Sequence, residues 1–264
     1  MNFGKLFKKK EKENENSKNL LSFVLLSQAY FDKDEFIANL KSEWDIDVDV
    51  EVEVTEQNDI LIFETDGMRA TVGLMPGPIP NGEAEQAAAA NYLWTEAINV
   101  TKSHVAHLLV SVIPIDNDVV EAGKLLVKLC DICLIDKCTI GVYTAGTVFE
   151  PEFYRDVAAL MSSRELPIFN WVYVGLRRVK EGIISGYTYG LKDFGKDEIE
   201  IIGTRASFDE LRMFLYNIAS YVIESNVILR DGETIGFTAD EKLPIQRSKG
   251  INLDGETLKI GYKN

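Results

Sequence analysis

The chain has 264 residues, of which 46% are hydrophobic and 10% aromatic, a composition too apolar for a disordered chain and sufficient for one large domain or two small ones. Its 42 acidic residues outnumber 28 lysines and arginines, so the formal net charge is −14. A charge of this sign repels the phosphate backbone, and we therefore expect no nucleic acid among the partners.

Residues 1–19 differ in charge from the rest of the chain. They contain six lysines and three glutamates, a net charge of +3, which leaves −17 on the remaining residues. We predict a disordered Lys/Glu-rich tail here, because few apolar residues could anchor it. Phe3, Leu6 and Phe7 lie beside lysines and could contact an anionic membrane, but one short basic segment gives no stable membrane insertion.

The lack of a visible secretory signal and the pattern of cysteines favour a cytoplasmic protein. The sequence shows no secretory signal and no run of about 18 uncharged apolar residues. Three cysteines are an odd number and lie close together, which suits a reducing compartment better than a disulfide framework.

Strands and helices alternate in the first half. Asp32 predicts a helix N-cap, with Glu35 three residues later, and the Pro/Gly-rich loop 75–82 leads into an Ala-rich helix. We predict strands at 20–29, 45–54, 60–64, 69–74 and 105–113, and helices at 32–44 and 83–98. This order is the ferredoxin-like β-α-β-β-α-β pattern with one extra hairpin strand.

The second half has a similar order of elements. Ser207 and Glu210 predict a capping box at the start of the helix 207–224. Further helices are expected at 118–134 and 152–161, and strands at 139–143, 169–179, 183–189 and 198–202, before a C-terminal hairpin region. The predicted fold is α+β, with mixed or antiparallel sheets covered by helices, and the element order suggests two ferredoxin-like halves in one compact unit, 20–115 and 116–264.

Several segments resemble a known family. They are 70–80 (ATVGLMPGPIP), 104–111 (HVAHLLVS), 171–175 (WVYVG), 185–191 (SGYTYGL), 194–198 (FGKDE) and 231–236 (DGETIG). Together they are similar to the domain-of-unknown-function 4261 family over roughly residues 20–264, with the C-terminal third the most typical. The resemblance implies no established activity, and some such proteins look like members of bacterial toxin–immunity neighbourhoods.

The most unusual feature is a strictly alternating acidic segment, 45–54. Its apolar residues would face one side of a strand and its carboxylates the other, at a spacing of about 6.6 Å. The carboxylates are Asp45, Asp47, Asp49, Glu51 and Glu53. They could form a docking surface for a basic protein partner, or a charged solvent face that protects an exposed strand from edge-to-edge pairing.

The cysteines and histidines do not form a recognisable metal site. Cys130, Cys133 and Cys138 would need a fourth ligand for zinc, and their spacing fits the buried face of a helix. His104 and His107 would lie on opposite faces if both belonged to one strand. No nucleophile motif or nucleotide-binding P-loop is present, so we expect no metal and no cofactor.

The loop 187–198 is the best candidate for a small-molecule or catalytic site. It combines Tyr187, Tyr189, Lys196 and Glu198 with glycines that allow tight turns, and His104 is a further candidate base. The simpler interpretation is a turn whose Gly and Phe residues are architectural.

Two functions follow from these observations. The first is a non-catalytic binding or immunity-type protein that uses the acidic surface to hold a basic partner protein. The alternative is an enzyme or small-ligand-binding protein with its site at the loop 187–198. A purely structural assembly subunit would instead show a large apolar patch, and the sequence predicts no oligomeric state.

Overall fold

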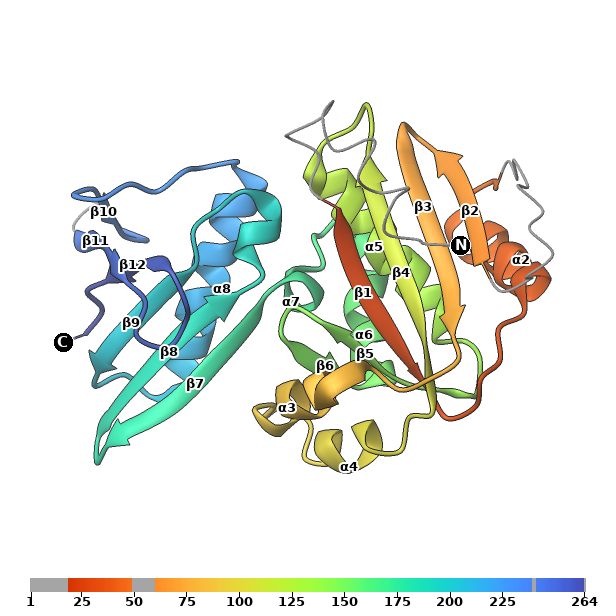
Figure 1. The fold of residues 1–264 in the computed structure, drawn as a ribbon. Helices are drawn as coiled ribbons and strands as arrows, with labels where there is room; N and C mark the ends of the chain where they lie inside the picture. Colours follow the sequence, from red (N-terminus) through yellow and green to blue (C-terminus); the bar gives the residue numbers. More distant parts are fainter. Residues whose placement is uncertain (1–18, 49–59, 239–240, 264) are drawn as a thin grey trace.

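The computed structural model describes residues 19–48, 60–238 and 241–263 (Figure 1). These residues form an α+β protein with seven α-helices and two six-stranded sheets, one antiparallel and one mixed. The predicted tail 1–19 lies outside the described residues except for Asn19. Within the described ranges, no helix is both long enough and apolar enough to cross a membrane.

The first sheet has the strand order β2-β3-β4-β1-β5-β6, and each neighbouring pair is antiparallel. Its strands are β1 (Leu20–Leu26), β2 (Ile60–Thr65), β3 (Met68–Met75), β4 (Ala106–Pro114), β5 (Thr139–Thr144) and β6 (Thr147–Phe149). The helices of this part of the chain are α2 (Lys33–Trp44), η1 (Pro80–Gly82), α3 (Glu83–Ala89), α4 (Ala97–Thr101), α5 (Val119–Cys133), α6 (Pro151–Ala159), η2 (Leu160–Ser163) and α7 (Ile168–Trp171).

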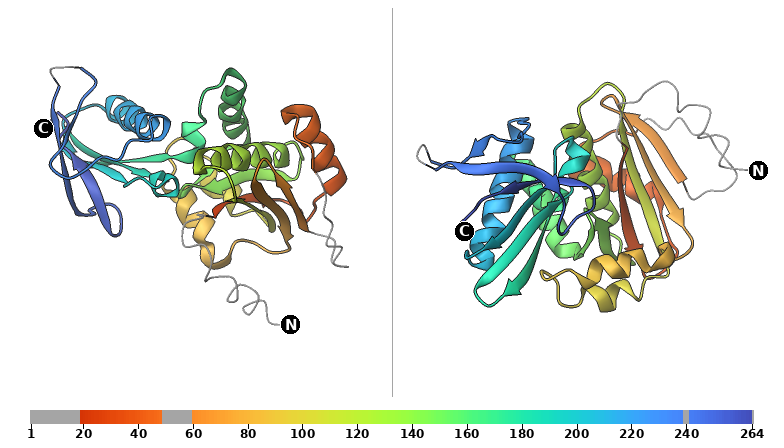
Figure 2. Two further views of the ribbon diagram at one scale, coloured as in Figure 1. Left: turned by 90° about the horizontal axis from the view of Figure 1, so that it is seen from above. Right: turned by 60° about the vertical axis from the view of Figure 1, so that its left-hand side comes forward.

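The main core lies between the inner face of this sheet and the helices α2 and α5 (Figure 2, left). Val24, Val72 and Val110 alternate with outward residues along their strands and are fully buried. Both helices begin at the aspartates that cap them: Asp32 accepts from the Glu35 N–H, and Asp118 accepts from the first turn of α5. The predicted starts of both helices are thereby confirmed.

The outer face of the first sheet is covered only at one end. There α3 and α4 pack a second, smaller cluster of buried residues against the sheet, formed by Leu25, Ile79, Ala84, Ala88, Ala97 and Val148. Farther along the same face, no described helix packs on the side chains of Leu21, Ile60 and Ile62, which remain 42–47% exposed.

The second sheet has the order β10-β11-β12-β9-β8-β7 and is mixed, because β12 and β9 run parallel. Its elements are β7 (Tyr173–Lys180), β8 (Ile183–Tyr189), η3 (Leu191–Phe194), β9 (Ile199–Thr204), α8 (Phe208–Glu224), β10 (Thr234–Ile235), β11 (Leu243–Lys249) and β12 (Glu256–Ile260). Helix α8 covers one face of β7 and β8, and it starts at the predicted capping box of Ser207 and Glu210.

Two tyrosines tie the sheets together. The Tyr92 hydroxyl, from the connection between α3 and α4, donates to the Val174 carbonyl of β7 at 2.8 Å. The Tyr173 hydroxyl of β7 donates in return to the Ala90 carbonyl at 2.7 Å. This exchange fixes the start of β7 beside the first sheet.

Ferredoxin-like halves are not shown by the described strands. In that fold the first and third strands lie side by side, whereas here β4 separates β3 from β1. The strands β5 and β6 also complete the first sheet, because β5 pairs with β1 at its centre. The last strand of the first sheet ends at Phe149 and the second sheet begins at Tyr173, so β5 and β6 belong to the first sheet although they follow the predicted boundary at 115/116. The division into the domains 20–115 and 116–264 stays a prediction.

The predicted acidic strand is wrong over its described part. Asp45 adopts a left-handed conformation (φ 53°) as the C-cap of α2, and Asp47 belongs to no strand. The Lys41 ammonium contacts both carboxylates, at 2.6 and 2.9 Å, so a local ion-pair cluster replaces the expected extended backbone. Asp49, Glu51 and Glu53 lie outside the described residues.

Two other predicted elements are interrupted. The Ala-rich helix 83–98 is split into α3 and α4, because the Asn91 side chain accepts from the Leu93 N–H and donates to the Val148 carbonyl. The predicted strand 169–179 begins instead with the short helix α7, where the Asn170 amide group donates to the Tyr154 carbonyl. In both segments a side-chain amide bonds to backbone outside the expected element.

Gly190 is a position where only glycine fits. Its φ is +121°, and a Cβ atom there would lie 2.1 Å from the Trp171 carbonyl oxygen. We expect Gly190→Ala to lower the free energy of unfolding by more than about 3 kcal/mol, through backbone strain and this overlap. Urea denaturation followed by tryptophan fluorescence measures the change.

Gly182→Ala is the matched control, because Gly182 also has positive φ (+67°) but no atom within 4 Å of the added Cβ. We expect Gly182→Ala to lower the free energy of unfolding by about 1 kcal/mol. Equal costs at the two glycines would show that the contact with Trp171 does not constrain the fold.

Candidate functional site

Residues 190–198 join β8 to β9 at the end of the second sheet nearest the first, and Tyr187 and Tyr189 of the predicted loop belong to the end of β8. The Glu198 side chain is buried, and its carboxylate accepts from the Thr188 hydroxyl at 2.7 Å and from the backbone N–H groups of Gly190 and Lys192 at 2.8 and 3.2 Å. Burial raises the pKa of Glu198, although these hydrogen bonds oppose the rise. Glu198 therefore holds the turn at Gly190 in place.

Lys196 and Tyr189 point to other partners. The buried Lys196 ammonium donates to the Asn226 side-chain oxygen at 2.6 Å, just beyond the end of α8, and burial lowers its pKa. The Tyr189 ring lies against Gly146 in the turn between β5 and β6, and burial raises the pKa of its hydroxyl. The three candidate side chains thus serve three separate contacts, and none of these contacts joins one candidate to another.

The two histidines hold the Pro/Gly-rich loop 75–82. His104 precedes β4, and its Nε2 accepts from the Ile79 N–H at 2.8 Å, so its Nδ1 carries the proton and donates to the Thr101 carbonyl. His107 donates through Nδ1 to the Gly77 carbonyl at 2.8 Å, and burial lowers its pKa. Both rings therefore act as neutral braces between β4 and this loop.

One acidic group near His104 lacks a hydrogen bond. Glu85 Oε1 lies 3.7 Å from His104 Nδ1, and Glu85 Oε2 is buried without a partner among the described residues. His104 is thus the one candidate base with a carboxylate beside it. Both of its ring nitrogens are already engaged, however, so it has no nitrogen left to take a proton from a substrate.

The cysteines are buried and unpaired. Burial raises the pKa of Cys130 and of Cys138 to about 12, which disfavours the thiolate that a reactive cysteine needs. Over the described ranges, no group of three or more His, Cys, Asp or Glu residues is arranged to hold a metal ion.

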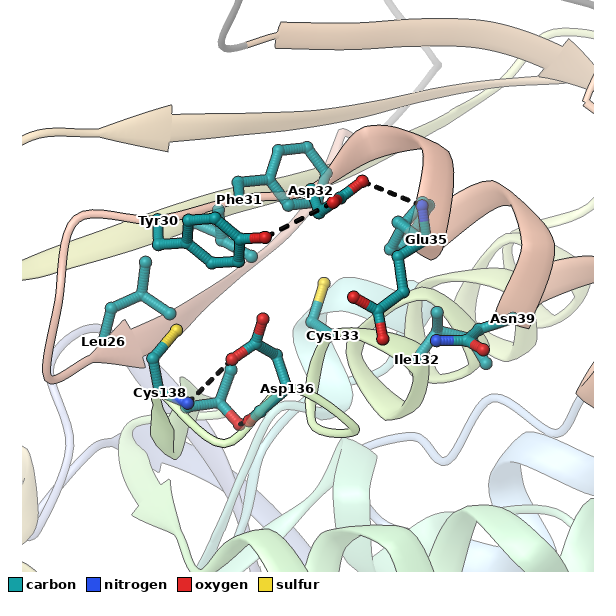
Figure 3. Close-up of a pocket in the computed structure, with 13 residues that line it drawn as sticks. Leu26, Tyr30, Phe31, Asp32, Glu35, Asn39, Ile132, Cys133, Asp136 and Cys138 are labelled. Atoms are coloured by element: carbon teal, nitrogen blue, oxygen red, sulfur yellow. Dashed lines mark hydrogen bonds between the residues drawn. The ribbon is translucent and has the colours of Figure 1, made fainter.

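A small pocket lies where the end of β1, the start of α2 and the end of α5 meet (Figure 3). Its volume is about 30 Å³, which is the space of a single water molecule. Asp32 at its rim caps α2, and Asp136 accepts from the Cys138 N–H at 2.8 Å. The pocket is too small for a substrate, and two of its carboxylates already have structural partners.

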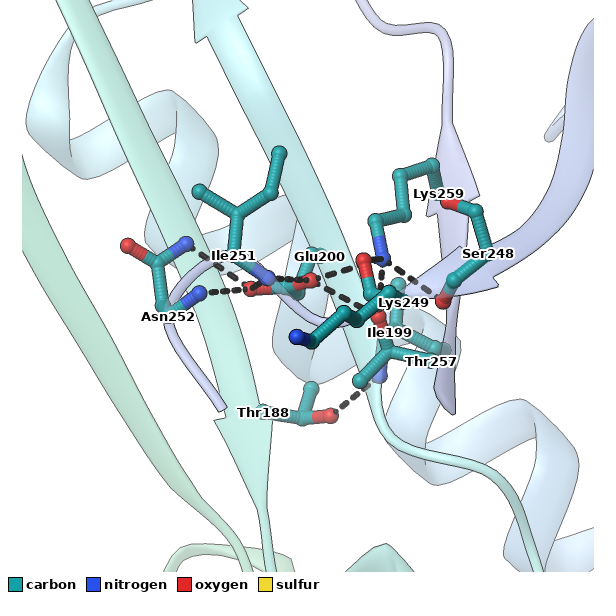
Figure 4. A network of polar contacts seen from close by, with 9 residues as sticks. All are labelled: Thr188, Ile199, Glu200, Ser248, Lys249, Ile251, Asn252, Thr257 and Lys259. Carbon is teal, nitrogen blue, oxygen red and sulfur yellow. Dashed lines mark hydrogen bonds and ion pairs between the residues drawn. The ribbon is translucent and has the colours of Figure 1, made fainter. Parts of the chain in front are cut away.

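The most extensive polar network surrounds Glu200 of β9 (Figure 4). This side chain is fully buried. Its carboxylate accepts from the N–H groups of Ile251 and Asn252 at 3.0 and 2.6 Å, and from the Asn252 side chain at 2.9 Å. The Thr257 hydroxyl donates to it at 2.7 Å, and the Lys259 ammonium lies at 3.0 Å.

These contacts determine the charge state of Glu200. Burial by itself would raise its pKa, but the hydrogen bonds from Thr257, Asn252 and Ile251 and the contact with Lys259 together lower it to about 2. The carboxylate is therefore a permanent internal anion that fastens the segment before β12 onto β9. Lys259 in turn donates to the carbonyls of Ser248 and Lys249 in β11, which joins three strands at one point.

A larger hollow is a groove of about 870 Å³ between α7, α8 and the start of α5. Its lining mixes apolar and charged side chains, among them Val119, Lys124, Arg164, Phe169, Met213 and Glu224. None of the sequence-predicted site residues lines it.

The fold and these contacts define an α+β protein of two sheets, whose second sheet is braced by the internal anion Glu200. Residues 187–261 match the family model described as Domain of unknown function (DUF4261), so this part of the chain is a DUF4261 domain. The resemblance seen in the sequence is confirmed there, and the segments 70–80, 104–111 and 171–175 lie outside the match. A comparison with curated proteins and one with solved structures each found no match.

Sequence reasoning missed the Glu200 network. A signal for it exists, since Glu200 lies between isoleucines in a strand that is otherwise apolar, and a buried carboxylate needs donors. Its partners come from 51–59 residues further along the chain, however, and the parallel pairing of β9 with β12 brings them close. That pairing has no local sequence pattern.

Glu200→Gln tests this network. Removing the charge leaves the Lys259 ammonium without its counter-ion, so we expect the free energy of unfolding to fall by about 3 kcal/mol at neutral pH. The lowered pKa means that the carboxylate's contribution is fully present above its ordinary value of 4.5 and is lost as pH falls through about 2. The difference between the two proteins should therefore shrink over that range, measured by denaturation at each pH.

Glu256→Gln is the control. Glu256 lies in the same hairpin, but its side chain is exposed and its ion pair with Arg247 is long, at 3.9 Å. It should change stability by less than about 1 kcal/mol. A Glu200→Gln protein as stable as wild type at neutral pH would contradict the assigned role.

Proposed function

We propose that this chain is a non-catalytic binding protein, of the immunity type, that holds a partner protein in the cytoplasm. The groups that could have carried catalysis have internal partners: His104 braces the Pro/Gly-rich loop, Lys196 bonds to Asn226, and Glu198 bonds to the turn at Gly190. Three unpaired buried thiols are compatible with a reducing compartment.

One observation carries the proposal: the apolar part of the outer face of the first sheet that no described helix covers. The strand register aligns two rows across it. These rows are Phe23–Leu109–Gly73–Ile60 and Leu21–Ser111–Thr71–Ile62. We call this surface the apolar sheet face.

An open face of an antiparallel sheet normally carries polar side chains. Here no charged side chain belongs to either row, and Leu21, Ile60 and Ile62 are 42–47% exposed. Ser111 and Thr71 at the centre of the second row are polar but uncharged, and apolar side chains flank them on both sides. Exposed apolar side chains gathered in this way are typical of a protein–protein contact. They supply the desolvated centre that a stable interface needs.

The charge of the chain favours a basic partner. The net charge is −14, and the Asp45 and Asp47 side chains are 89% and 84% exposed at the end of α2. Their described contact is with Lys41 alone, so they can still attract a cation. The other three predicted contact residues, Asp49, Glu51 and Glu53, lie outside the described residues.

The alternative is an enzyme or small-ligand-binding protein with its site at the loop 187–198. It would require Tyr189, Lys196 and Glu198 to converge on one ligand. Their contacts with Gly146, Asn226 and the turn at Gly190 favour the binding protein instead.

The apolar sheet face is tested with Ile60→Asn/Ile62→Asn. Tagged protein is used to capture partners from the native cell lysate, and the bound proteins are quantified by mass spectrometry. The amount of any stoichiometric partner captured by the variant should fall by at least about tenfold, because two apolar side chains that the partner would bury become polar. The control Met213→Asn/Ile228→Asn removes two equally exposed apolar side chains elsewhere and should retain the partner.

The acidic contribution is tested with Asp45→Asn/Asp47→Asn, since asparagine tolerates the left-handed conformation of residue 45. Partner retention should fall several-fold at low salt and less at high salt, where charges are screened. Glu152→Gln/Asp156→Asn removes two exposed carboxylates from α6 and is the control. If each variant captures the same proteins as its control, in equal amounts, the proposed function is wrong.

A further inference from the structure

The strand β7 forms one edge of the second sheet and pairs only with β8 among the described strands. In an antiparallel ladder, the N–H and C=O groups of one residue point toward the same neighbour. The Val174 carbonyl accepts from the Tyr92 hydroxyl outside the ladder, so Val174 directs its backbone groups away from β8. Leu176 and Arg178 share this direction, because they follow at intervals of two.

The outward groups of Leu176 and Arg178 have no strand beside them in the described structure. They present two N–H donors and two C=O acceptors along an edge that Tyr92 leaves open. An exposed edge of this kind can accept an extended segment as an added strand. Opposite the edge, β7 is held in place by regular pairing with β8 from Tyr173 to Arg178, and the register shifts at a bulge between Arg178 and Lys180.

The same stretch is unusually basic for an acidic protein. Arg177, Arg178 and Lys180 are exposed, and Val179 between them is 50% exposed. Arg178 lies over the Phe208 ring, with 5.7 Å from its guanidinium carbon to the ring centroid. None of the three cations makes an ion pair with a described residue, although the chain as a whole has a net charge of −14.

The positive charge determines which strand can be added. Two copies of this edge would bring like charges together, so the cations oppose pairing of the chain with itself through β7. An acidic extended segment is attracted by the same cations and can meet the open backbone groups. The positive charge along this edge therefore opposes self-association and also selects an acidic partner.

We propose that the edge of β7 from Leu176 to Lys180 binds an extended acidic segment of a partner protein as an additional strand. Backbone hydrogen bonds to Leu176 and Arg178 supply the pairing, and Arg177, Arg178 and Lys180 supply the preference for carboxylates. This surface is distinct from the apolar sheet face and does not depend on it.

The test uses a fluorescein-labelled, N-acetylated hexapeptide of alternating valine and aspartate, with binding to the full chain followed by fluorescence anisotropy. Binding should weaken as salt is raised. Arg177→Glu/Lys180→Glu should lower the affinity by at least about tenfold, because attraction becomes repulsion. The control Lys242→Glu/Lys249→Glu makes the same change of charge on exposed residues near β11 and should bind as wild type does.

A second measurement separates strand addition from attraction between charges alone. A peptide with prolines in place of two valines keeps its carboxylates but loses N–H donors, and it should bind at least about tenfold more weakly. Bound parent peptide should also slow hydrogen exchange at the Leu176 and Arg178 amides. Equal binding of the proline peptide, unchanged exchange at both amides, or wild-type affinity of Arg177→Glu/Lys180→Glu would each overturn the proposal. The variants used for the apolar sheet face leave β7 unaltered, so the two proposals fail independently.

Discussion

The buried carboxylate of Glu200 is the constraint on which the second sheet depends. A charge removed from water must be compensated by donors, and here the compensation comes from Ile251, Asn252, Thr257 and Lys259. All of these lie on one C-terminal hairpin, so the chain must return past β9 to supply them. The parallel pairing of β12 with β9 is the geometry that allows this, and Lys259 then extends the network to β11.

The pKa values of Glu198 and Glu200 shift in opposite directions, although the two residues lie close together in the chain. Glu198 has three neutral donors, and burial raises its pKa, whereas Glu200 has additional donors and an ammonium group that lower its pKa. Such a divergence often marks an acid–base pair in an active site. Here both groups are at most 3% exposed, and each one fastens a backbone segment. The divergence therefore accompanies two architectural contacts of the second sheet.

Local chemistry in the sequence predicts local structure well. Asp32, Asp118 and the pair Ser207–Glu210 begin helices because their side chains satisfy backbone donors a few residues away. The failures arise where a distant partner decides the outcome. Asn91 bonds to Val148 and splits a helix, and the histidines bond to a loop about 25–30 residues away. For the candidate site, residues 187–198 fall within the matched range, and the directions of their side chains depend on α8 and on the turn at Gly146.

The two proposed surfaces have one property in common: each leaves groups at the surface that another polypeptide could cover. Most polar side chains that could perform chemistry are saturated by internal bonds, as His104, Lys196, Glu198 and Glu200 illustrate. At the surface, the described structure leaves two features without a covering element: an apolar face of the first sheet and a strand edge of the second. Unsatisfied apolar area and unpaired backbone groups are both relieved by another polypeptide. The two proposals therefore rest on different surface features, the apolar area of one sheet and the backbone groups of the other, and each can be tested without the other.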